Sequence, residues 1–427
     1  MTTSINQSPS LNRADVVAVI RAPLEQYPPT LNQVALLSES GLKVAVVDAR
    51  HDDYQLADFR FPERVHRIHA VEHNQSFKDR PLSAIEKIRR SLQFRRCVHS
   101  TIRQQNPSVV IAYDPNAMAA VGKIWKRRNR PKLIWHFHEL FLPQNAGRGW
   151  MTQRSIRFAA NQCEHSDLVI FPDVDRARVY RDQLRRTFDE LIVMNCPRRL
   201  GNVPSDRLGP ALRSLGVPVK SPIVLFQGWI GPSRCFEAVI RSMSHWPQNA
   251  VFVLIGPVSD HYKKSLAALA DQTGVGARLH FMGTVPYQEL PSWTVGGTVG
   301  LSIVSDDIEE DPSWRYTAGA VNKRFEYMSV GLPQVANIGP GMRQLIEDTN
   351  TGLLADPNDV TEIGRQIASM LCTQERVQQV AHNARKMHLE SFCYEQQFKI
   401  ALHVINSWCG ISHARLSPPS LPKKDVA

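Results

Sequence analysis

Residues 321–336, VNKRFEYMSVGLPQVA, combine ionisable side chains with a sharp helix end. We predict a short helix over 322–330, because Gly331 suits the position after a helix and Pro333 prevents its continuation. The small residues that precede it, TAGA, allow a ligand to approach the backbone closely. Free N–H groups and a positive dipole end at Asn322 would favour a diphosphate. The sequence therefore predicts an anion site at the start of this helix.

Lys323 and Glu326 lie one turn apart on the predicted helix. Lys323, in the first turn, would add a positive charge to the anion site. Glu326 would face the same side, where its carboxylate can accept hydrogen bonds from both hydroxyls of a ribose. The alternative interpretation is a surface ion pair between positions i and i+3, which has the same spacing.

Residues 132–140, KLIWHFHEL, predict a strand that runs into a loop at its carboxyl end. Open α/β sheets bind ligands at that end. The imidazole of His138 is suited to hydrogen-bonding a sugar hydroxyl or to stabilising charge. We expect His136 to point into the sheet, and a helix-capping role for His138 is the alternative.

The elements around these residues alternate between strands and helices, which predicts doubly wound α/β structure. In the first half we expect strands at 16–20, 43–47, 109–112, 132–136, 168–171 and 191–194, and helices at 30–40, 84–105, 117–128 and 175–184. Residues 201–220 contain glycines and prolines without a strong period, and we interpret them as a linker. In the second half we expect strands at 223–226, 251–255, 278–282, 300–304 and 334–336, and helices at 235–243, 263–272, 322–330, 361–371, 374–389 and 394–408.

The pattern Asn-Lys-x-Phe-Glu-Tyr-Met-x-x-Gly-Leu-Pro resembles the donor-site helix of retaining GT-B glycosyltransferases, the GT4-like or "glycosyltransferase group 1" family. Residues 163–175, 223–240, 280–290 and 346–359 resemble other segments of that family. The resemblance implies a GT-B fold, with two Rossmann-like domains facing a central cleft. It implies an acceptor domain over 14–200, a nucleotide-sugar domain over 221–390, a C-terminal helix over 391–412 that crosses back, and a disordered tail over 413–427.

The family also implies roles for individual residues. The donor nucleotide-sugar, UDP- or GDP-linked, is expected at Glu326, Lys323, Arg234, Asn322, Gly228 and Thr284. His138 matches a His-Asp/Glu pair that reaches the transferred sugar, so it is the expected catalytic residue. The acceptor is expected to be a glycan or a lipid-linked molecule. No cofactor and no metal are expected, and the acidic run at 306–311 is interpreted as a solvated loop.

This chain departs from the family pattern at several positions. Trp229 follows Gly228 where many members have arginine, Cys235 stands where glycine is usual, and Ala318 replaces a glutamate that touches the sugar. The resemblance implies that the loop at 21–30, RAPLEQYPPT, forms the acceptor side, and its three prolines predict a stiff loop. These departures leave two alternatives open: a catalytically silent GT-B binding subunit, and a GT-B epimerase or phosphorylase, although no lysine is marked for pyridoxal phosphate.

Composition and charge bear on partners and location. The seven cysteines are scattered and form no CxxC pair, which predicts reduced thiols in a cytoplasmic protein. Residues 1–200 contain 31 Lys and Arg against 20 Asp and Glu, whereas residues 201–427 contain 20 of each. This basic half predicts an anionic partner. No aromatic residues alternate with the basic runs, so nucleic acid is not expected.

We expect instead that the basic half docks on the inner face of an anionic membrane. Ile85, Ile88 and Leu92 form one stripe among the basic residues of 84–96, while WKRRNR at 125–130 and GWMTQRSIRF at 149–158 put tryptophan beside arginines. No apolar run approaches the ~18 residues that a membrane span needs. The alternative is that the stripe packs on the sheet and that the arginines are only solvated.

Overall fold

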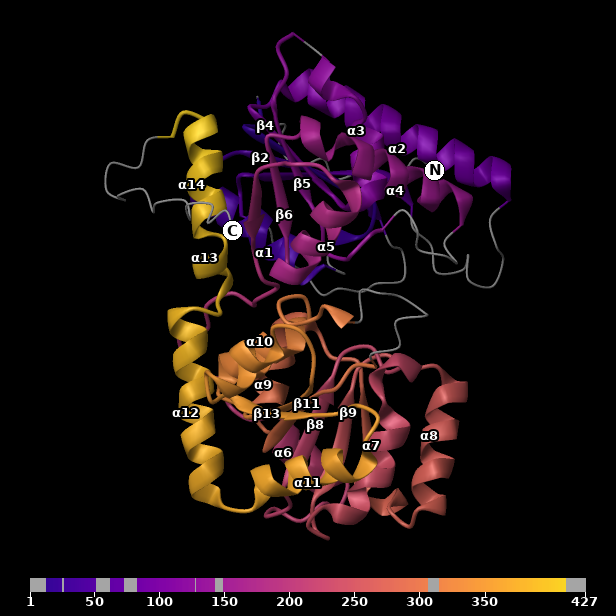
Figure 1. The fold of residues 1–427 in the computed structure, drawn as a ribbon, viewed down its shortest axis with the longest axis vertical. Coiled ribbons are helices and arrows are strands. Elements are labelled where there is room, and N and C mark those ends of the chain that lie inside the picture. Colours follow the sequence, from indigo (N-terminus) through magenta and orange to yellow (C-terminus); the bar gives the residue numbers. More distant parts are fainter. Residues whose placement is uncertain are drawn as a thin grey trace, which may run out of the picture. The chain divides into compact units, whose positions relative to one another are not determined.

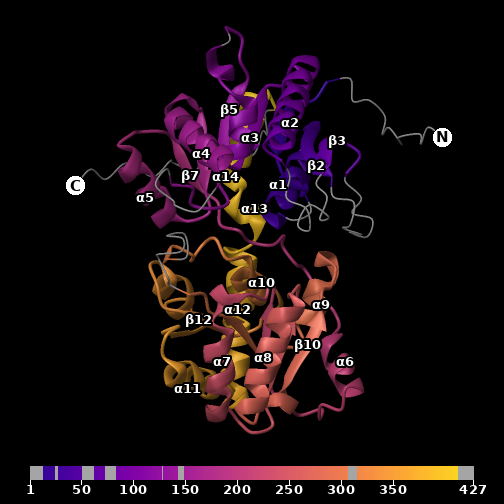
Figure 2. The same ribbon diagram turned by 90° about the vertical axis from the view of Figure 1, so that its right-hand side faces the viewer.

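The structure is a computed structural model that describes residues 13–24, 27–50, 62–72, 83–126, 128–142, 149–305 and 315–411. The chain divides into two compact units, which are drawn in Figures 1 and 2. Unit 1 comprises residues 1–171, 181–191 and 397–427, and unit 2 comprises 172–180 and 192–396. Helix α5 (Val174–Leu184) is divided between them.

Unit 1 contains a seven-stranded sheet in the order β3-β2-β1-β4-β5-β6-β7. Its strands are β1 (Val16–Ile20), β2 (Val44–Arg50), β3 (Val65–Glu72), β4 (Val109–Tyr113), β5 (Lys132–His136), β6 (Leu168–Phe171) and β7 (Glu190–Ile192). Neighbouring strands from β3 to β6 pair in parallel. Sequence order reverses between β1 and β4, and ligands bind at the carboxyl ends of strands beside such a switch point.

Strand β3 is absent from the sequence prediction because its pattern, VHRIHAVE, mixes polar and apolar residues without an apolar run or a regular alternation. It forms the outer edge of the sheet, where polar side chains are tolerated. Arg67 and His69 on β3 both contact the buried carboxylate of Asp48 on β2, with the His69 Nδ1 at 2.8 Å. Tertiary contacts therefore supply what the local pattern lacks.

The helices of unit 1 differ from the prediction at their ends. They are α1 (Pro28–Glu39), α2 (Ala84–Gln105), α3 (Asp114–Val121), α4 (Trp150–Gln162), the second part of α5, and α14 (Lys399–Trp408). Helix α1 begins at Pro28, so two of the three prolines expected to stiffen the loop lie in a first helical turn, where proline is favoured. The helix predicted over 117–128 ends earlier, because Gly122 adopts a left-handed φ of 68°.

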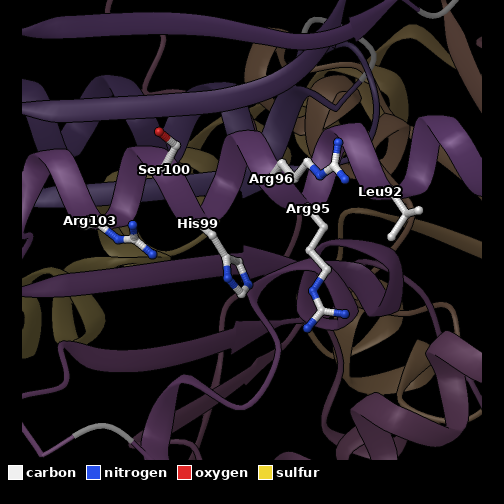
Figure 3. A pocket seen from close by; sticks show the side chains of 6 residues that line it. All are labelled: Leu92, Arg95, Arg96, His99, Ser100 and Arg103. Atoms are coloured by element: carbon white, nitrogen blue, oxygen red, sulfur yellow. The ribbon is translucent and has the colours of Figure 1, made fainter.

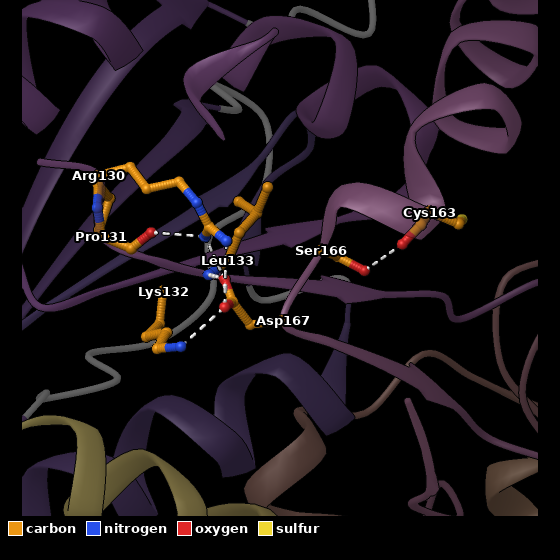
Figure 4. Close-up of polar contacts among 7 residues, drawn as sticks. All are labelled: Arg130, Pro131, Lys132, Leu133, Cys163, Ser166 and Asp167. Carbon is orange, nitrogen blue, oxygen red and sulfur yellow. Dashed lines mark hydrogen bonds and ion pairs between the residues drawn. The ribbon is translucent and has the colours of Figure 1, made fainter. Parts of the chain in front are cut away.

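Asp167 joins the starts of two neighbouring strands in unit 1 (Figure 4). Its carboxylate accepts hydrogen bonds from Arg130, from Lys132 Nζ at 2.9 Å and from the backbone N–H of Leu133 at 2.9 Å. Burial raises the pKa of Asp167, but these three donors more than offset that effect, and the net pKa is lowered. The contacts fix the register of β5 against β6 and thereby the position of His138 beyond the end of β5.

Unit 2 contains a fully parallel six-stranded sheet in the order β10-β9-β8-β11-β12-β13. Its strands are β8 (Ile223–Gln227), β9 (Val251–Ile255), β10 (Leu279–Gly283), β11 (Val299–Ser302), β12 (Gln334–Asn337) and β13 (Gly352–Ala355). The switch point lies between β8 and β11. Strands β8 and β9 are buried throughout, as expected for parallel strands covered on both faces.

The helices of unit 2 are α6 (Leu208–Ser214), α7 (Phe236–Ser242), α8 (Asp260–Gln272), α9 (Leu290–Thr294), α10 (Asn322–Val330), α11 (Val360–Leu371), α12 (Gln374–Glu390) and, at the unit boundary, α13 (Tyr394–Gln397). Helix α6 lies within the stretch interpreted as a linker, so that stretch is not free of structure. Leu208 and Leu212 of α6 are buried against Leu225 of β8. The helix is too short for a visible period, and only its packing reveals it.

Candidate functional site

The predicted short helix in unit 2 is α10, which starts at Asn322 and ends where Gly331 takes a φ of 73°. Val321 precedes it and provides no side-chain cap, so the first turn presents backbone N–H groups without a capping oxygen from that residue. Asn322 is half-buried at this end. The helix start thus leaves backbone N–H groups without a side-chain cap from Val321, and the anion site itself stays a prediction.

Lys323 is directed toward the end of strand β8. Its side chain is buried, with the residue 8% exposed, and its Nζ lies 4.2 Å from the ring centroid of Phe226. A Cβ at Gly228, whose φ is 114°, would lie 3.5 Å from this Nζ. Burial, followed by the charges of Arg234 and Arg324, lowers the pKa of Lys323 well below its usual value, although Glu326 opposes the shift. The ammonium group therefore lies in a cation-rich setting that an anion would relieve.

Glu326 is oriented by a chain of side-chain hydrogen bonds and is not a member of a surface ion pair with Lys323. Gln227 donates from Nε2 to Glu326 Oε2 at 2.6 Å, and Thr294 donates from Oγ1 to Gln227 Oε1 at 2.7 Å. Burial raises the pKa of Glu326, and the bond from Gln227 and the charge of Lys323 partly offset this. The sequence analysis missed Gln227 and Thr294; the one available signal was the position of Gln227 directly before Gly228.

Arg324 is a third residue that the sequence analysis missed at this site. It is completely buried and donates to Ser302 Oγ at 3.0 Å, to Asn337 Oδ1 at 2.9 Å and to Thr317. These partners lie at the ends of β11 and β12 and in the loop before α10, so Arg324 fixes the loop that leads into the helix. Burial lowers its pKa to about 9.

Arg234 lies between β8 and α7, in the single 3-10 turn Pro232–Arg234. Its charge acts on the pKa values of both Lys323 and Arg324, which places it in the same cationic group. The next residue, Cys235, has a φ of 53°. Such a left-handed conformation costs a non-glycine residue about 1–2 kcal/mol, which explains why glycine suits this position.

Trp229 occupies the position at which an arginine is common in the family pattern. Its side chain is 54% exposed, and its ring packs beside Gly231, where an added Cβ would lie 2.2 Å from the indole Cη2. Ala318 is buried in a cluster with Cys196 and Met342, so an apolar contact stands where a glutamate would stand. The loop that joins β8 to α7 therefore supplies one cation, Arg234, and one exposed aromatic ring.

The structure tests neither the predicted role of Thr284 nor the interpretation of the acidic run at 306–311. Thr284 is exposed on the loop after β10, the edge strand of the sheet, and no contact described here joins it to Lys323 or Glu326, so its role stays a prediction. The acidic run at 306–311 lies outside the described residues. Within the described ranges, no group of three or more His, Cys, Asp or Glu residues is arranged to hold a metal ion.

His138 lies in unit 1, beyond the carboxyl end of β5, and is only 4% exposed. Asp114 accepts from its backbone N–H at 2.9 Å and lies 3.1 Å from its Nδ1, while Thr30 Oγ1 lies 2.9 Å from its Nε2. The carboxylate assigns the proton to Nδ1, so Nε2 accepts from the threonine hydroxyl. Asp114 itself has a left-handed φ of 61° at the start of α3.

His136 is part of a second, fully buried polar group. Its Nδ1 and the Tyr113 hydroxyl both lie 2.9 Å from Gln33 Oε1, and both donate to it. Burial, and then the nearby His138, lower the pKa of His136 well below its usual value. His136 is therefore a neutral core residue, whereas His138 lies beyond the carboxyl end of β5, the end at which open α/β sheets bind ligands.

Two family models match this chain, one in each half of the sequence. A family model described as "Glycosyl transferases group 1" matches residues 221–373, and one described as "Glycosyltransferase Family 4" matches residues 30–194. Together they cover about three quarters of the chain.

Curated relatives match only part of the chain. A D-inositol 3-phosphate glycosyltransferase of Xylanimonas cellulosilytica is 29% identical over 187 residues, which are 43% of this chain and 42% of that protein. One from Mycobacterium avium is 26% identical over 194 residues, 45% of this chain and 43% of that protein. The matched region thus spans about two fifths of the length of these relatives.

Solved structures resemble the chain over most of its length. Sucrose-phosphate synthase from Thermosynechococcus elongatus has a TM-score of 0.73 at 14% identity and covers 94% of this chain and 100% of its own. Anabaena HepE in complex with UDP-glucose has a TM-score of 0.69 at 16% identity, with 92% and 100% covered. At this identity the likeness shows the fold alone: two Rossmann-like units.

Proposed function

Because this chain belongs to the group 1, family 4 glycosyltransferases and has their GT-B fold, we propose that it transfers a sugar from a nucleoside diphosphate sugar to a glycan or lipid-linked acceptor. The proposed reaction breaks the bond between the anomeric carbon and the diphosphate oxygen and forms a bond to an acceptor hydroxyl, with retention of configuration. The nucleoside diphosphate leaves and the acceptor proton is released. The proposed compartment is the cytoplasm, as the seven free cysteines predict.

The observation that carries this proposal is the cationic group at the start of α10. Lys323 is buried beside Arg234, at the end of a helix that presents uncapped N–H groups. A leaving diphosphate develops negative charge there, and preorganised donors that need not reorganise stabilise such charge strongly. No metal ion and no cofactor are required in this scheme.

Glu326 is the proposed ligand of the ribose hydroxyls. Its Oε2 is held by Gln227, which leaves the remaining acceptor capacity of the carboxylate for two hydroxyl donors. Thr294 holds Gln227 in turn, so the carboxylate keeps one orientation before the ligand binds. Such preorganisation lowers the entropic cost of binding.

We propose that His138 acts on the transferred sugar. Asp114 sets its tautomer, and Nε2 is the ring atom that a sugar hydroxyl would approach, replacing Thr30 there. This role belongs to the transfer step and not to diphosphate binding.

The test is a thermal-shift screen of UDP- and GDP-linked sugars, followed by product analysis with and without a chelator. We expect one nucleotide series to raise the unfolding temperature and the corresponding nucleoside diphosphate to be released slowly even without acceptor. Binding without any release would support the silent binding subunit instead. If no nucleotide-sugar shifts the transition or is consumed, the proposed function is wrong.

A further inference from the structure

Helix α2 of unit 1 is long but packs against the protein with only part of one face. Of its 22 residues, those that are buried are Phe94, Val98, Thr101 and Ile102, so no residue before Phe94 is buried. Its contacts within unit 1 are mainly to α3 and to β3. Figure 1 shows α2 running along the outside of unit 1. Most of its length thus presents side chains to solvent.

The face opposite to Phe94 and Val98 has an unusual composition. Three apolar residues, Ile85, Ile88 and Leu92, are 78%, 41% and 47% exposed. Arg89, Arg96 and Arg103 follow one another at seven-residue spacing and are exposed as well. Positions three, four and seven apart lie on one side of a helix, so these six residues form a single band, the α2 outer stripe.

The surface along the stripe is hollowed. One depression, of about 360 Å³, is lined by Leu92, Arg95, Arg96, His99, Ser100 and Arg103, and Figure 3 shows the arginines projecting from the helix. A second, of about 490 Å³, is lined by residues of the preceding turns, including Ile85, Ile88 and Arg89. Apolar side chains thus occupy the first half of the stripe, and cations extend along all of it.

We propose that the α2 outer stripe docks on the surface of an anionic phospholipid bilayer, with the helix lying parallel to it. Exposed isoleucine and leucine side chains are suited to the boundary between headgroups and acyl chains, and the interspersed arginines are complementary to lipid phosphates. The charge is one-sided, because Glu86, the one acidic residue of α2, is engaged with Ser83 in the capping box at the helix start. Among the described residues, no helix is long and apolar enough to cross the bilayer.

The stripe favours a lipid surface over two other occupants. A nucleic acid would use the arginines but would gain nothing from Ile85 and Ile88, and the aromatic residue of α2, Phe94, is only 1% exposed and unavailable for stacking. A second copy of the chain would bring arginine rows together, which repel each other. An anionic bilayer provides both an apolar layer for the isoleucine and leucine side chains and phosphate groups for the arginines.

The experiment measures co-sedimentation of the full-length protein with phosphatidylcholine vesicles, with and without phosphatidylglycerol. We expect binding only to the anionic vesicles, weakened by salt. The triple variant I85S/I88S/L92S and the triple variant R89Q/R96Q/R103Q should each reduce binding at least tenfold. The matched controls, L215S/V219S for exposed apolar residues and R213Q/R241Q/R365Q for exposed arginines, should bind like the wild type.

Several outcomes would overturn the proposal: binding at low salt that does not depend on phosphatidylglycerol, binding that both stripe variants retain, or no binding. A loss in the arginine variant alone, accompanied by equal binding to RNA, would assign the stripe to nucleic acid. A change of oligomeric state in the apolar variant would assign it to a second copy. Nucleotide-sugar hydrolysis, measured in the same preparations, reports on the proposed function separately.

Discussion

The carboxylate of Glu326 is oriented by Gln227, which Thr294 holds in turn, and we expect it to bind the ribose hydroxyls of the donor. We predict that Glu326→Ala lowers kcat/KM about 100-fold, the effect of losing ~3 kcal/mol of hydrogen bonds to a charged group, while the fold is retained. Glu375→Ala, an exposed acid on α12, is the control. Nucleotide-sugar affinity and turnover that equal the wild type in a folded variant would remove Glu326 from the site.

Lys323 links diphosphate binding to pH. Because its pKa is lowered by burial and by Arg234, part of the Lys323 population loses its proton as pH rises through that lowered value. We therefore predict that the affinity for UDP or GDP falls with rising pH and that Lys323→Met abolishes this dependence, as titration calorimetry will show.

Lys323→Met and Arg234→Ala should each weaken diphosphate binding by at least ~1.5 kcal/mol. Equal losses for nucleoside and nucleoside diphosphate would contradict the phosphate assignment.

His138 is held by partners on both ring nitrogens, so a substitution there tests catalysis and structure together. We predict that His138→Ala lowers the rate of sugar transfer at least tenfold, since general acid–base groups contribute on the order of 10²-fold or more. The Kd for UDP or GDP should stay within a factor of two, because the residues of the proposed diphosphate site belong to unit 2. Thr30→Val, which removes the hydroxyl at Nε2, separates the two roles. A matching loss of nucleotide affinity and thermal stability would make His138 structural.

At the scale of elements, a hydrogen bond of His388 connects α12 to Leu200, in the chain segment before α6. Its Nε2 accepts from the Leu200 N–H at 3.1 Å, and its Nδ1 donates to the Phe392 carbonyl at 3.1 Å, so the neutral ring satisfies both. Burial lowers its pKa to about 4, with the charges of Arg385 and Arg199 acting in the same direction. A charged ring would place a second donor against the N–H of Leu200.

This arrangement predicts a pH-dependent stability. Below pH 6.5 His388 becomes protonated in the unfolded state, whereas in the folded state it stays neutral down to about pH 4. The free energy of unfolding therefore falls as the pH decreases from 6.5 to about 4. We expect His388→Gln to be less stable than the wild type at pH 7 and the difference to shrink by ~2 kcal/mol by pH 5. Denaturant unfolding at the two pH values measures this; a difference that is independent of pH would contradict it.

For the whole molecule, the division into two units predicts which residues a bound nucleotide protects from amide hydrogen exchange. Lys323, Glu326 and Arg234 all belong to unit 2. We expect UDP or GDP to slow amide hydrogen exchange most strongly at the end of β8, in residues 232–234 and in the first turn of α10. Exchange in the central strands β1 and β4 of unit 1 should change less. Protection centred on unit 1 would show that the nucleotide site has been placed in the wrong unit.

Local chemistry was sufficient to determine several features from the sequence. Hydrophobic runs separated by turn residues predicted the α/β order of both halves, and Gly331 with Pro333 predicted the end of α10. A helix end of this kind depends only on neighbouring residues, since a left-handed φ and a missing N–H are properties of single positions. The candidate anion site was predictable for the same reason.

Contacts between distant residues decided the rest. Gln227 orients Glu326 across 99 residues of sequence, and Thr294 holds Gln227 across 67. Arg324 contacts residues of three different segments. Strand β3 pairs with β2, and its polar side chains contact the buried Asp48. Whether Ile85, Ile88 and Leu92 pack on the sheet or face solvent was open in the sequence, because a helix with apolar residues on both sides has no unique inner face. The tertiary structure selected Phe94 and Val98 for the core, since those side chains meet the sheet, and left the stripe exposed.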